Sequence, residues 1–529
     1  MNRAVLARAA CLASAAAAIL CAAPVEAQFL APAVERSGFD QRLRQPALRL
    51  ATLGRSTLAF DDENNEINQW DFGGSTVGLV SDRNGNSLDL FIDAANTSSE
   101  RTVSGVTGES FRNNGSVFGL NAVARNGEKF AFGLNAGYQG YGAGIPQQPG
   151  YYQDESLGLR DFVTVFSGRA YGGKLGWGAR LGFANEDLDS ELKTRGIEDG
   201  EEVLSGGDVI EPLTPFSLEA AHISRTTLGV GFGWMAAKWG DVSINWDWYK
   251  ASIEGSNETR KRIYETDEPR KNTLYSAMLT LRPTSGMTLA GMVGSGTEEA
   301  DETFRFTQSN GQGAPPLTGR GTRLARELEK RFFKSRLAWT PPSMPDLLLG
   351  ADFRVAYSKD DVTAATGPED FNAFISSLDG TGLNPGSPVI DELQEVRHWD
   401  AGFGVGYLVT PKLRLGLEGH RANDARDGTG VHARTMTTDF NGGAEYAVSP
   451  SWQARIGGWH RSLDQDVFTA NNEGVAAALT LGAGYRPVNS KFSLDAGVEL
   501  MDRSTDYPDP TDGTGSGFRF VLYNRWSFN

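Results

Sequence analysis

The chain ends in a stretch whose alternation restricts what it can fold into. Residues 517–529 read GFRFVLYNRWSFN. Successive side chains of a β-strand point to opposite faces, so one face here is aromatic and apolar and the other is polar. A strand with this apolar face at the edge of a sheet would promote aggregation of a soluble protein. It suits a barrel with lipid outside and a wet interior, although a strand of a soluble sandwich is the alternative.

The aromatic residues near the end of this strand carry a resemblance. Trp526 and Phe528 lie on its apolar face. A terminal strand that ends in aromatics resembles the closing strand of bacterial outer-membrane β-barrels. The resemblance implies that these two residues form the membrane-insertion signal read by the barrel assembly machinery. The sequence departs from the pattern because Asn529 follows Phe528.

Residues 1–27 have the pattern of a secretory signal peptide. Basic residues precede an Ala-rich apolar run, and a small-x-small motif ends at Ala27. Both cysteines, Cys11 and Cys21, lie in this segment. We therefore expect neither a disulfide nor a cysteine-based metal site in the mature chain.

Charge and hydropathy exclude two further classes of protein. The net charge of −16 argues against nucleic acid as a partner. After the signal peptide, no run of about 18 apolar residues could form a transmembrane helix. A closed barrel is the membrane-spanning architecture that remains, because only half of each strand must be apolar.

Strand-like alternation recurs along the chain. The clearest hairpin is 226–254, where apolar residues alternate with glycine or polar residues on both sides of a Trp239-Gly240-Asp241 turn. Each arm has about 10 residues, enough to cross a bilayer when tilted. The same alternation is found in residues 129–141, 174–185, 346–359, 400–409 and 491–501.

The connectors between these strands alternate between short and long. The short ones carry turn residues, at 126–127, 172–173, 239–241, 283–286, 341–343, 410–411, 449–451 and 487–489. The long polar ones are roughly 96–111, 142–158, 186–224, 257–270, 298–326, 361–396, 422–430, 463–474 and 504–516. This alternation predicts an all-β, transmembrane, antiparallel up-and-down barrel over residues 87–529, of about 18 strands. Residues 87–95 are expected to pair with the terminal strand.

Residues 28–86 precede the predicted barrel as an N-terminal hatch or periplasmic segment. Ser37-Gly38-Phe39, Leu53-Gly54-Arg55, Asp61-Asp62 and Gly78-Leu79 resemble the N-terminal hatch of the outer-membrane long-chain fatty acid transporter superfamily. The usual Asn-Pro-Ala segment is missing. The resemblance implies a plugged barrel of about 14 strands that takes up hydrophobic compounds. A periplasmic extension without a gating role is the alternative.

Charged residues recur on the polar face of the predicted strands. An unpaired charge in a dry interior would be very costly, so these residues either line a water-filled pore and set its selectivity or form structural ion pairs. The pore-lining candidates are Arg180, Asp247, Arg336, Arg354, Asp400, Arg414, Glu418, Glu445, Arg455, Asp495 and Glu499.

The longest predicted connector, 186–224, is strongly acidic. It is the third long loop, and its position resembles the loop that narrows general porins. The alternative is an outward loop that meets cations bound to lipopolysaccharide. The constriction-loop candidates are Glu186, Asp187, Asp189, Glu191, Glu198 and Asp199.

Enzymatic sites are not indicated by the sequence. His420 and His432 flank a short Asp427-Gly428 loop, but they fall on opposite faces of their strands and are interpreted as two separate histidines at the rim. No phosphate-binding glycine loop is present. We expect no catalytic residue, no cofactor and no metal.

The sequence therefore predicts a bacterial outer-membrane channel or transporter for small solutes. Hatch-gated uptake of hydrophobic compounds is one alternative, and a structural or secretion-associated barrel is another. The expected partners are outer-membrane lipid, lipopolysaccharide, the assembly machinery and a small-molecule solute. The oligomeric state stays open.

Overall fold

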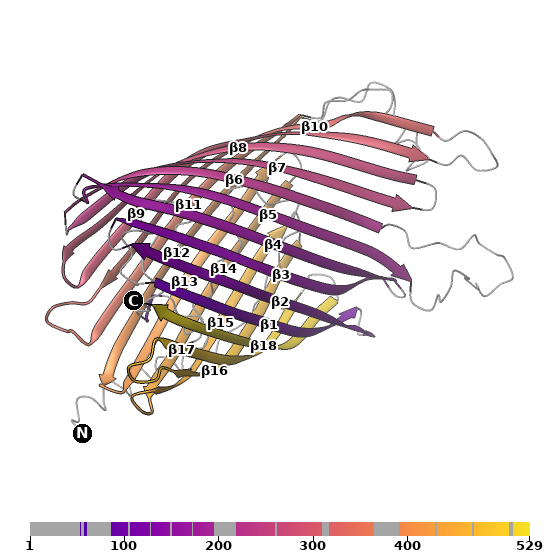
Figure 1. The fold of residues 1–529 in the computed structure, drawn as a ribbon. Helices are drawn as coiled ribbons and strands as arrows, with labels where there is room; N and C mark the ends of the chain where they lie inside the picture. Colours follow the sequence, from indigo (N-terminus) through magenta and orange to yellow (C-terminus); the bar gives the residue numbers. More distant parts are fainter. Residues whose placement is uncertain are drawn as a thin grey trace.

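The described residues of the computed structural model form one closed antiparallel sheet of eighteen strands (Figure 1). The strands are β1 Asn86–Val103, β2 Val106–Asn126, β3 Phe130–Gln148, β4 Tyr151–Ala170, β5 Leu175–Thr194, β6 Leu218–Ala237, β7 Gly240–Thr259, β8 Arg262–Thr284, β9 Met287–Gln308, β10 Leu317–Trp339, β11 Leu347–Thr363, β12 Asp391–Thr410, β13 Leu413–Gly428, β14 Val431–Ala447, β15 Trp452–Val467, β16 Ala470–Tyr485, β17 Phe492–Asp506 and β18 Thr511–Phe528. The predicted fold class and strand number are confirmed.

The structure describes most of the barrel and four residues before it. These are residues 53, 58–60, 86–103, 106–126, 129–148, 151–171, 173–194, 218–237, 239–259, 262–308, 317–363, 391–428, 431–467, 470–506 and 511–528. The predicted signal peptide lies outside them, as does most of the predicted hatch. Within these ranges, no helix is long and apolar enough to span a membrane.

The sheet closes between its first and last strands, as predicted. β1 pairs with β18 along its whole length, from Asn86 opposite Phe528 to Val103 opposite Thr511. Arg525 Nε donates to Asp89 Oδ1 at 2.7 Å, and Arg519 Nε donates to Asp93 Oδ1 at 2.7 Å. Ion pairs on the inner face therefore reinforce the ladder that makes the sheet a barrel.

Short turns connect the strands at one end of the barrel, where the C-terminus also lies (Figure 1). Asn489 takes a positive φ of 62° between β16 and β17, a conformation that asparagine tolerates better than most residues. The Ser490 amide donates to the Pro487 carbonyl at 3.0 Å and closes this turn. The short connectors predicted from turn residues are found where the sequence placed them.

The strands are longer than the sequence analysis expected, so the predicted boundaries of the long loops are wrong. They contain 15 to 23 residues, whereas about 9–11 suffice to cross a bilayer. Most of the predicted loop 96–111 belongs to β1 and β2, and most of 257–270 belongs to β7 and β8. Where a strand extends beyond the lipid, both of its faces can be polar. The apolar–polar alternation from which the loop boundaries were predicted is then lost.

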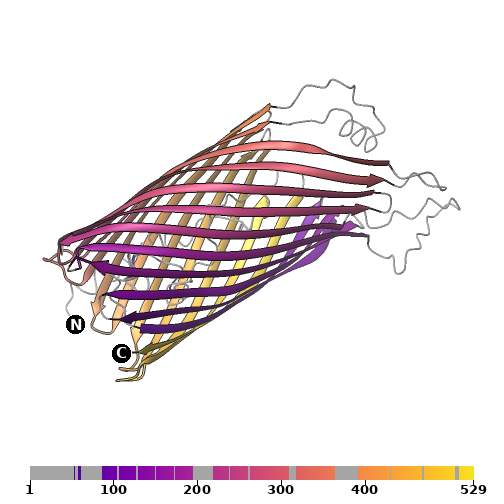
Figure 2. The same cartoon turned by 45° about the horizontal axis from the view of Figure 1, so that its top comes forward.

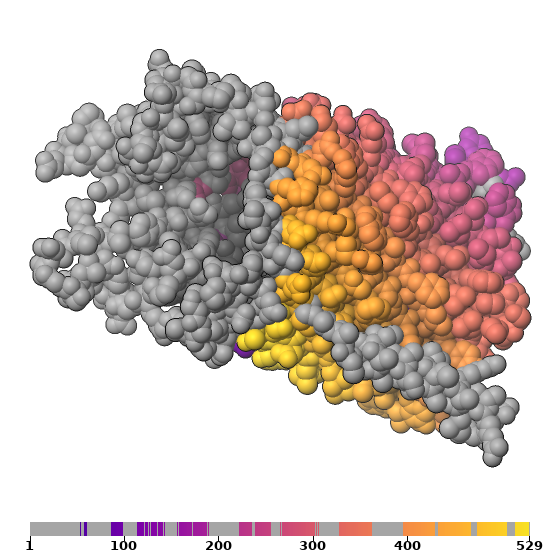
Figure 3. Space-filling view, turned by 180° about the vertical axis from the view of Figure 1, so that it is seen from behind, coloured from indigo at the N-terminus to yellow at the C-terminus, as the bar shows by residue number. Residues whose placement is uncertain are grey.

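The outer face is apolar and is ringed by aromatics near the short turns. Phe130, Trp177, Trp234, Trp339 and Trp452 are exposed there, each within a few residues of a turn. Trp452 packs against Tyr485 with ring centroids 4.6 Å apart, and Phe492 packs against Trp526 at 5.9 Å. Figure 2 shows the strands running obliquely around the wall, and Figure 3 shows the continuous outer surface over the C-terminal strands. An apolar band with an aromatic girdle matches the outer face of a membrane-spanning barrel.

Candidate functional site

The inner face of the barrel holds all the residues predicted to line a pore. On each strand they alternate with outward residues, as Glu499 does with the exposed Val498 and Leu500. The most deeply buried of them are Arg180, Asp247, Glu418, Glu445, Arg455, Asp495 and Glu499. Arg336, Arg354, Asp400 and Arg414 are half-buried.

Buried ion pairs join several of these residues across the wall. Arg455 Nε donates to Glu445 Oε2 at 2.9 Å, and its Nη1 donates to Asp495 Oδ1 at 2.5 Å. Arg180 pairs with Asp247, which is fully buried. Because each charge lies against an opposite one, the desolvation cost of an isolated charge is offset. These contacts favour the interpretation that the residues form structural ion pairs over the interpretation that they line a pore and contact a solute.

Glycines on the inner face leave room for side chains to meet across an intervening strand. Gly229 of β6 lies directly opposite both Arg180 of β5 and Asp247 of β7. A Cβ at Gly229 would collide with the Asp247 carboxylate. The pair can therefore form over β6 only because that position has no side chain.

A short stretch before the barrel lies against the inner face. Leu53, Leu58, Ala59 and Phe60 are 0–3% exposed, and three of them form an apolar cluster. The Leu58 amide donates to Glu418 Oε2 at 2.6 Å, and the Ala59 amide donates to the same oxygen at 3.3 Å. One carboxylate of β13 thus holds two consecutive backbone amides of the N-terminal segment.

Five glycines of neighbouring strands form the surface on which these residues lie. We call this surface the glycine wall; it consists of Gly350 of β11, Gly404 and Gly406 of β12, Gly416 of β13 and Gly443 of β14. A Cβ at Gly404 would approach the Leu58 Cβ to 2.7 Å, and one at Gly443 would approach the Leu53 carbonyl oxygen to 2.8 Å. The backbone of the segment fits this closely only because the wall lacks side chains.

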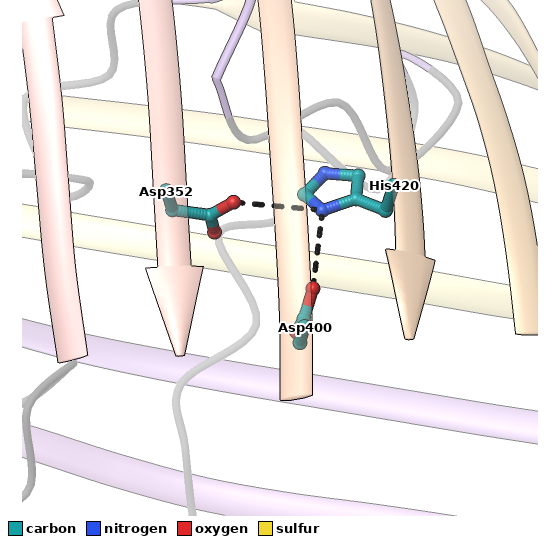
Figure 4. Close-up of side chains that lie close together, drawn as sticks. All are labelled: Asp352, Asp400 and His420. Carbon is teal, nitrogen blue, oxygen red and sulfur yellow. Dashed lines mark ion pairs between the residues drawn. The ribbon is translucent and has the colours of Figure 1, made fainter. Parts of the chain in front are cut away.

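A histidine and two aspartates meet beside the glycine wall. Asp352 of β11, Asp400 of β12 and His420 of β13 point toward one another from three consecutive strands (Figure 4). His420 Nδ1 lies 3.7 Å from Asp352 Oδ1 and 3.9 Å from Asp400 Oδ1. The other ring nitrogen, Nε2, is hydrogen-bonded to Glu418 Oε1.

The sequence analysis placed His420 at the rim, which is wrong. β13 continues to Gly428, so His420 lies eight positions inside the strand, on the inner face. The strand end was set too early because residues 421–428 are polar. Only the strand register brings Asp352 opposite Gly402 and Gly402 opposite His420. The one feature of the sequence that pointed to this cluster was that Asp352, Asp400 and His420 all fall on the inner face of predicted strands.

The constriction-loop candidates are divided by the structure. Glu186, Asp187, Asp189 and Glu191 belong to β5, which runs to Thr194, so the prediction that they lie in a loop is wrong. Glu186 is buried on the inner face, and Asp187 bonds His222 of β6 at 2.6 Å. Glu198 and Asp199 lie outside the described residues.

Apolar clusters interrupt the polar inner face. One contains Val123, Ala131, Val163 and Val165 of β2–β4. Trp459, Leu463, Ala476 and Met501 of β15–β17 form a second, and Met278, Ala290 and Met292 of β8 and β9 form a third. These inward apolar groups were not anticipated, because the sequence analysis expected the inner face to be polar throughout.

Comparisons with known proteins give matches to solved barrels. No protein-family model matches the sequence, and no curated protein matches it either. The Pseudomonas putida toluene transporter TodX is 11% identical, with 90% of this chain and 97% of that chain covered and a TM-score of 0.36. A Pseudomonas aeruginosa FadL homologue is 12% identical over 90% and 97%, with a TM-score of 0.37.

A third solved structure is a receptor of another kind. The ferric yersiniabactin uptake receptor FyuA from Yersinia pestis is 8% identical over 84% of this chain and 81% of that chain, with a TM-score of 0.43. The matches thus include barrels of two kinds. At these identities and scores the likeness carries no argument about function.

Proposed function

We propose that the protein is a bacterial outer-membrane barrel that passes small solutes and that residues 28–86 close its lumen as a hatch. The aromatic girdle and apolar outer face support the membrane location, with the signal peptide 1–27 and the terminal Trp526 and Phe528 directing export and assembly. Eighteen strands suffice for an aqueous lumen, because porins of about 16–18 strands enclose aqueous channels.

The docked N-terminal stretch is the observation that carries the proposal. Leu58 and Ala59 are held by Glu418 and lie on the glycine wall, inside the barrel. A periplasmic extension without a gating role would have no reason to bury Leu53 and Phe60 in the lumen. The burial of these residues in the lumen supports a segment that obstructs a solute.

Hydrophobic solutes are a second candidate class of cargo. The inward apolar clusters around Val163, Trp459 and Met292 favour them, because a pore for hydrophilic solutes has a polar interior. An apolar solute would gain about 25 cal/mol for each Å² of apolar surface that it buries against such clusters.

Planar-bilayer conductance tests the hatch directly. The mature chain should be nearly silent, whereas a variant that lacks residues 28–85 should show stable open steps. Heat-dependent migration on gels checks that both barrels are folded. Equal conductance of the two forms would refute the hatch, and silence of both folded forms would refute an open channel in favour of a structural role.

A solute-uptake assay in proteoliposomes separates the two classes of cargo. If hydrophobic compounds are the cargo, the deletion should speed entry of an apolar fluorescent probe more than entry of a sugar of similar size. Faster entry of the sugar alone would assign the barrel to hydrophilic solutes.

A further inference from the structure

The cluster of Asp352, Asp400 and His420 has the composition of a metal site. It offers one imidazole nitrogen and two carboxylate oxygens, and these atoms all lie within 4.8 Å of one another. An ion bound at about 2.1 Å by two such atoms in tetrahedral geometry separates them by about 3.4 Å. The 3.7 and 3.9 Å distances from His420 Nδ1 to the two carboxylates are a few tenths of an ångström longer.

Two oxygens of this cluster are ion-pair partners of His420 and make no regular hydrogen bond. Asp352 Oδ1 and Asp400 Oδ1 are buried atoms, and neither has a hydrogen-bond partner among the described residues. Both face the same nitrogen of His420. Buried acceptor atoms without a donor are costly, and a cation bound between them would satisfy both at once.

Gly402 makes the meeting of these side chains possible. It lies directly opposite Asp352 on one side and His420 on the other. A Cβ at this position would collide with Asp352 Oδ1 and with the His420 ring. The missing side chain on β12 thus allows ligands from β11 and β13 to converge.

The other side of His420 is already fixed. Nε2 is hydrogen-bonded to Glu418, and a metal-bound histidine typically donates its second ring nitrogen to a carboxylate in this way. With Nε2 protonated, the neutral ring presents the lone pair of Nδ1 to the two aspartates. The tautomer needed for metal binding is therefore the one that Glu418 favours.

The local charges balance if His420 is protonated and leave a deficit that a cation can fill if it is neutral. Arg336 lies opposite Asp352 in the ladder, and Arg354 lies opposite Asp400. These two guanidinium groups face three carboxylates, once Glu418 is included. With a neutral histidine the group carries a net negative charge, which favours a divalent ion.

We propose that Asp352, Asp400 and His420 bind a divalent transition-metal ion of the zinc class inside the lumen. Mixed imidazole and carboxylate ligands suit Zn²⁺ and its neighbours, whereas Ca²⁺ and Mg²⁺ prefer oxygen ligands alone. Three protein ligands leave a coordination position for water or a solute. Because Glu418 holds both His420 and the amides of Leu58 and Ala59, the ion also stabilises the docked N-terminal segment. The site itself does not depend on the proposed transport function.

Calorimetric titration of the detergent-solubilised full chain with Zn²⁺ tests the proposal. The protein must carry no polyhistidine tag, because a tag would bind zinc. One Zn²⁺ should bind per chain, and Mg²⁺ should not compete. Co²⁺ should give the visible spectrum of a low-symmetry site with nitrogen and oxygen ligands, a readout that needs no variant.

Three substitutions should weaken the site and one should not. Asp352→Asn and Asp400→Asn remove a ligand charge, and Gly402→Ala displaces two ligands; each should lower Zn²⁺ affinity by about 10- to 100-fold or more. Asp424→Asn is the matched control, since it removes a neighbouring aspartate that bonds His398 at 2.7 Å. It should leave the affinity unchanged.

Two results would overturn the proposal. One is the absence of Zn²⁺ and Co²⁺ binding by the folded wild-type barrel. The other is binding that persists unchanged in all three site variants, as adventitious binding to acidic loops would give. Neither result bears on the conductance test, so the site and the hatch can fail independently.

Discussion

Inward glycines determine which charged residues can meet in this barrel. Gly229 lies between Arg180 and Asp247, and a Cβ at Gly484 would come within 2.6 Å of Asp495 and 2.5 Å of Arg455. Neighbouring strands in a sheet lie about 4.8 Å apart, so side chains two strands apart must reach over the strand between them. A glycine on the intervening strand provides the space for the two side chains to meet.

Removing an arginine that two buried carboxylates share should destabilise the barrel. Arg455→Met leaves Glu445 and Asp495 buried without their arginine, so the free energy of unfolding should fall by about 3–5 kcal/mol. Urea-induced unfolding of the barrel reconstituted in lipid vesicles measures this free energy. Arg397→Met is the control, because Arg397 is 63% exposed beside Glu395 and the loss of an exposed ion pair should cost far less. Equal effects of the two substitutions would contradict the structural role of the Arg455 pair.

The described residues of the N-terminal segment lie on the four strands β11–β14. The glycine wall removes side chains over four adjacent strands, and Glu418 supplies an acceptor in its middle. A β-strand gains no stability from glycine. The repeated glycines on the inner face of these strands are therefore explained by the close approach of another backbone.

Filling the wall should release the N-terminal stretch. Gly406→Val places atoms where the Ala59 carbonyl lies, so Leu58, Ala59 and Phe60 cannot lie on the wall as they do. Trypsin should then cut after Arg55 faster than in the wild type, because a released segment is more accessible to the protease. Gly419→Val is the control, since that position faces outward against Phe440 at ordinary contact distance. If both variants are cut at the wild-type rate, the glycine wall does not hold the segment.

At the scale of the whole molecule, the sequence predicted the barrel, its eighteen strands and the pairing of β1 with β18, because lipid imposes alternation on every strand. It did not predict strand ends such as residues 421–428, where both faces are polar and no periodicity remains. Contacts such as that between Glu418 and Leu58 join residues 360 positions apart. They depend on register and on three-dimensional closure, which composition and spacing do not encode.

Conductance of a cross-linked barrel tests most directly whether the docked segment closes the lumen. In Leu58→Cys with Gly404→Cys the two Cβ atoms would start 2.7 Å apart, so moving the segment about 1 Å away from the wall brings them to the Cβ spacing of a disulfide. Both native cysteines lie in the predicted signal peptide, so the mature chain should form no other bond; Leu58→Cys with the outward Gly419→Cys should form none. Because a side chain at residue 404 crowds the docked stretch, we predict that the reduced pair conducts more than the nearly silent wild type and that oxidation makes it silent again. A cross-linked barrel that conducts as well as the reduced one, or as the form without residues 28–85, would contradict the account.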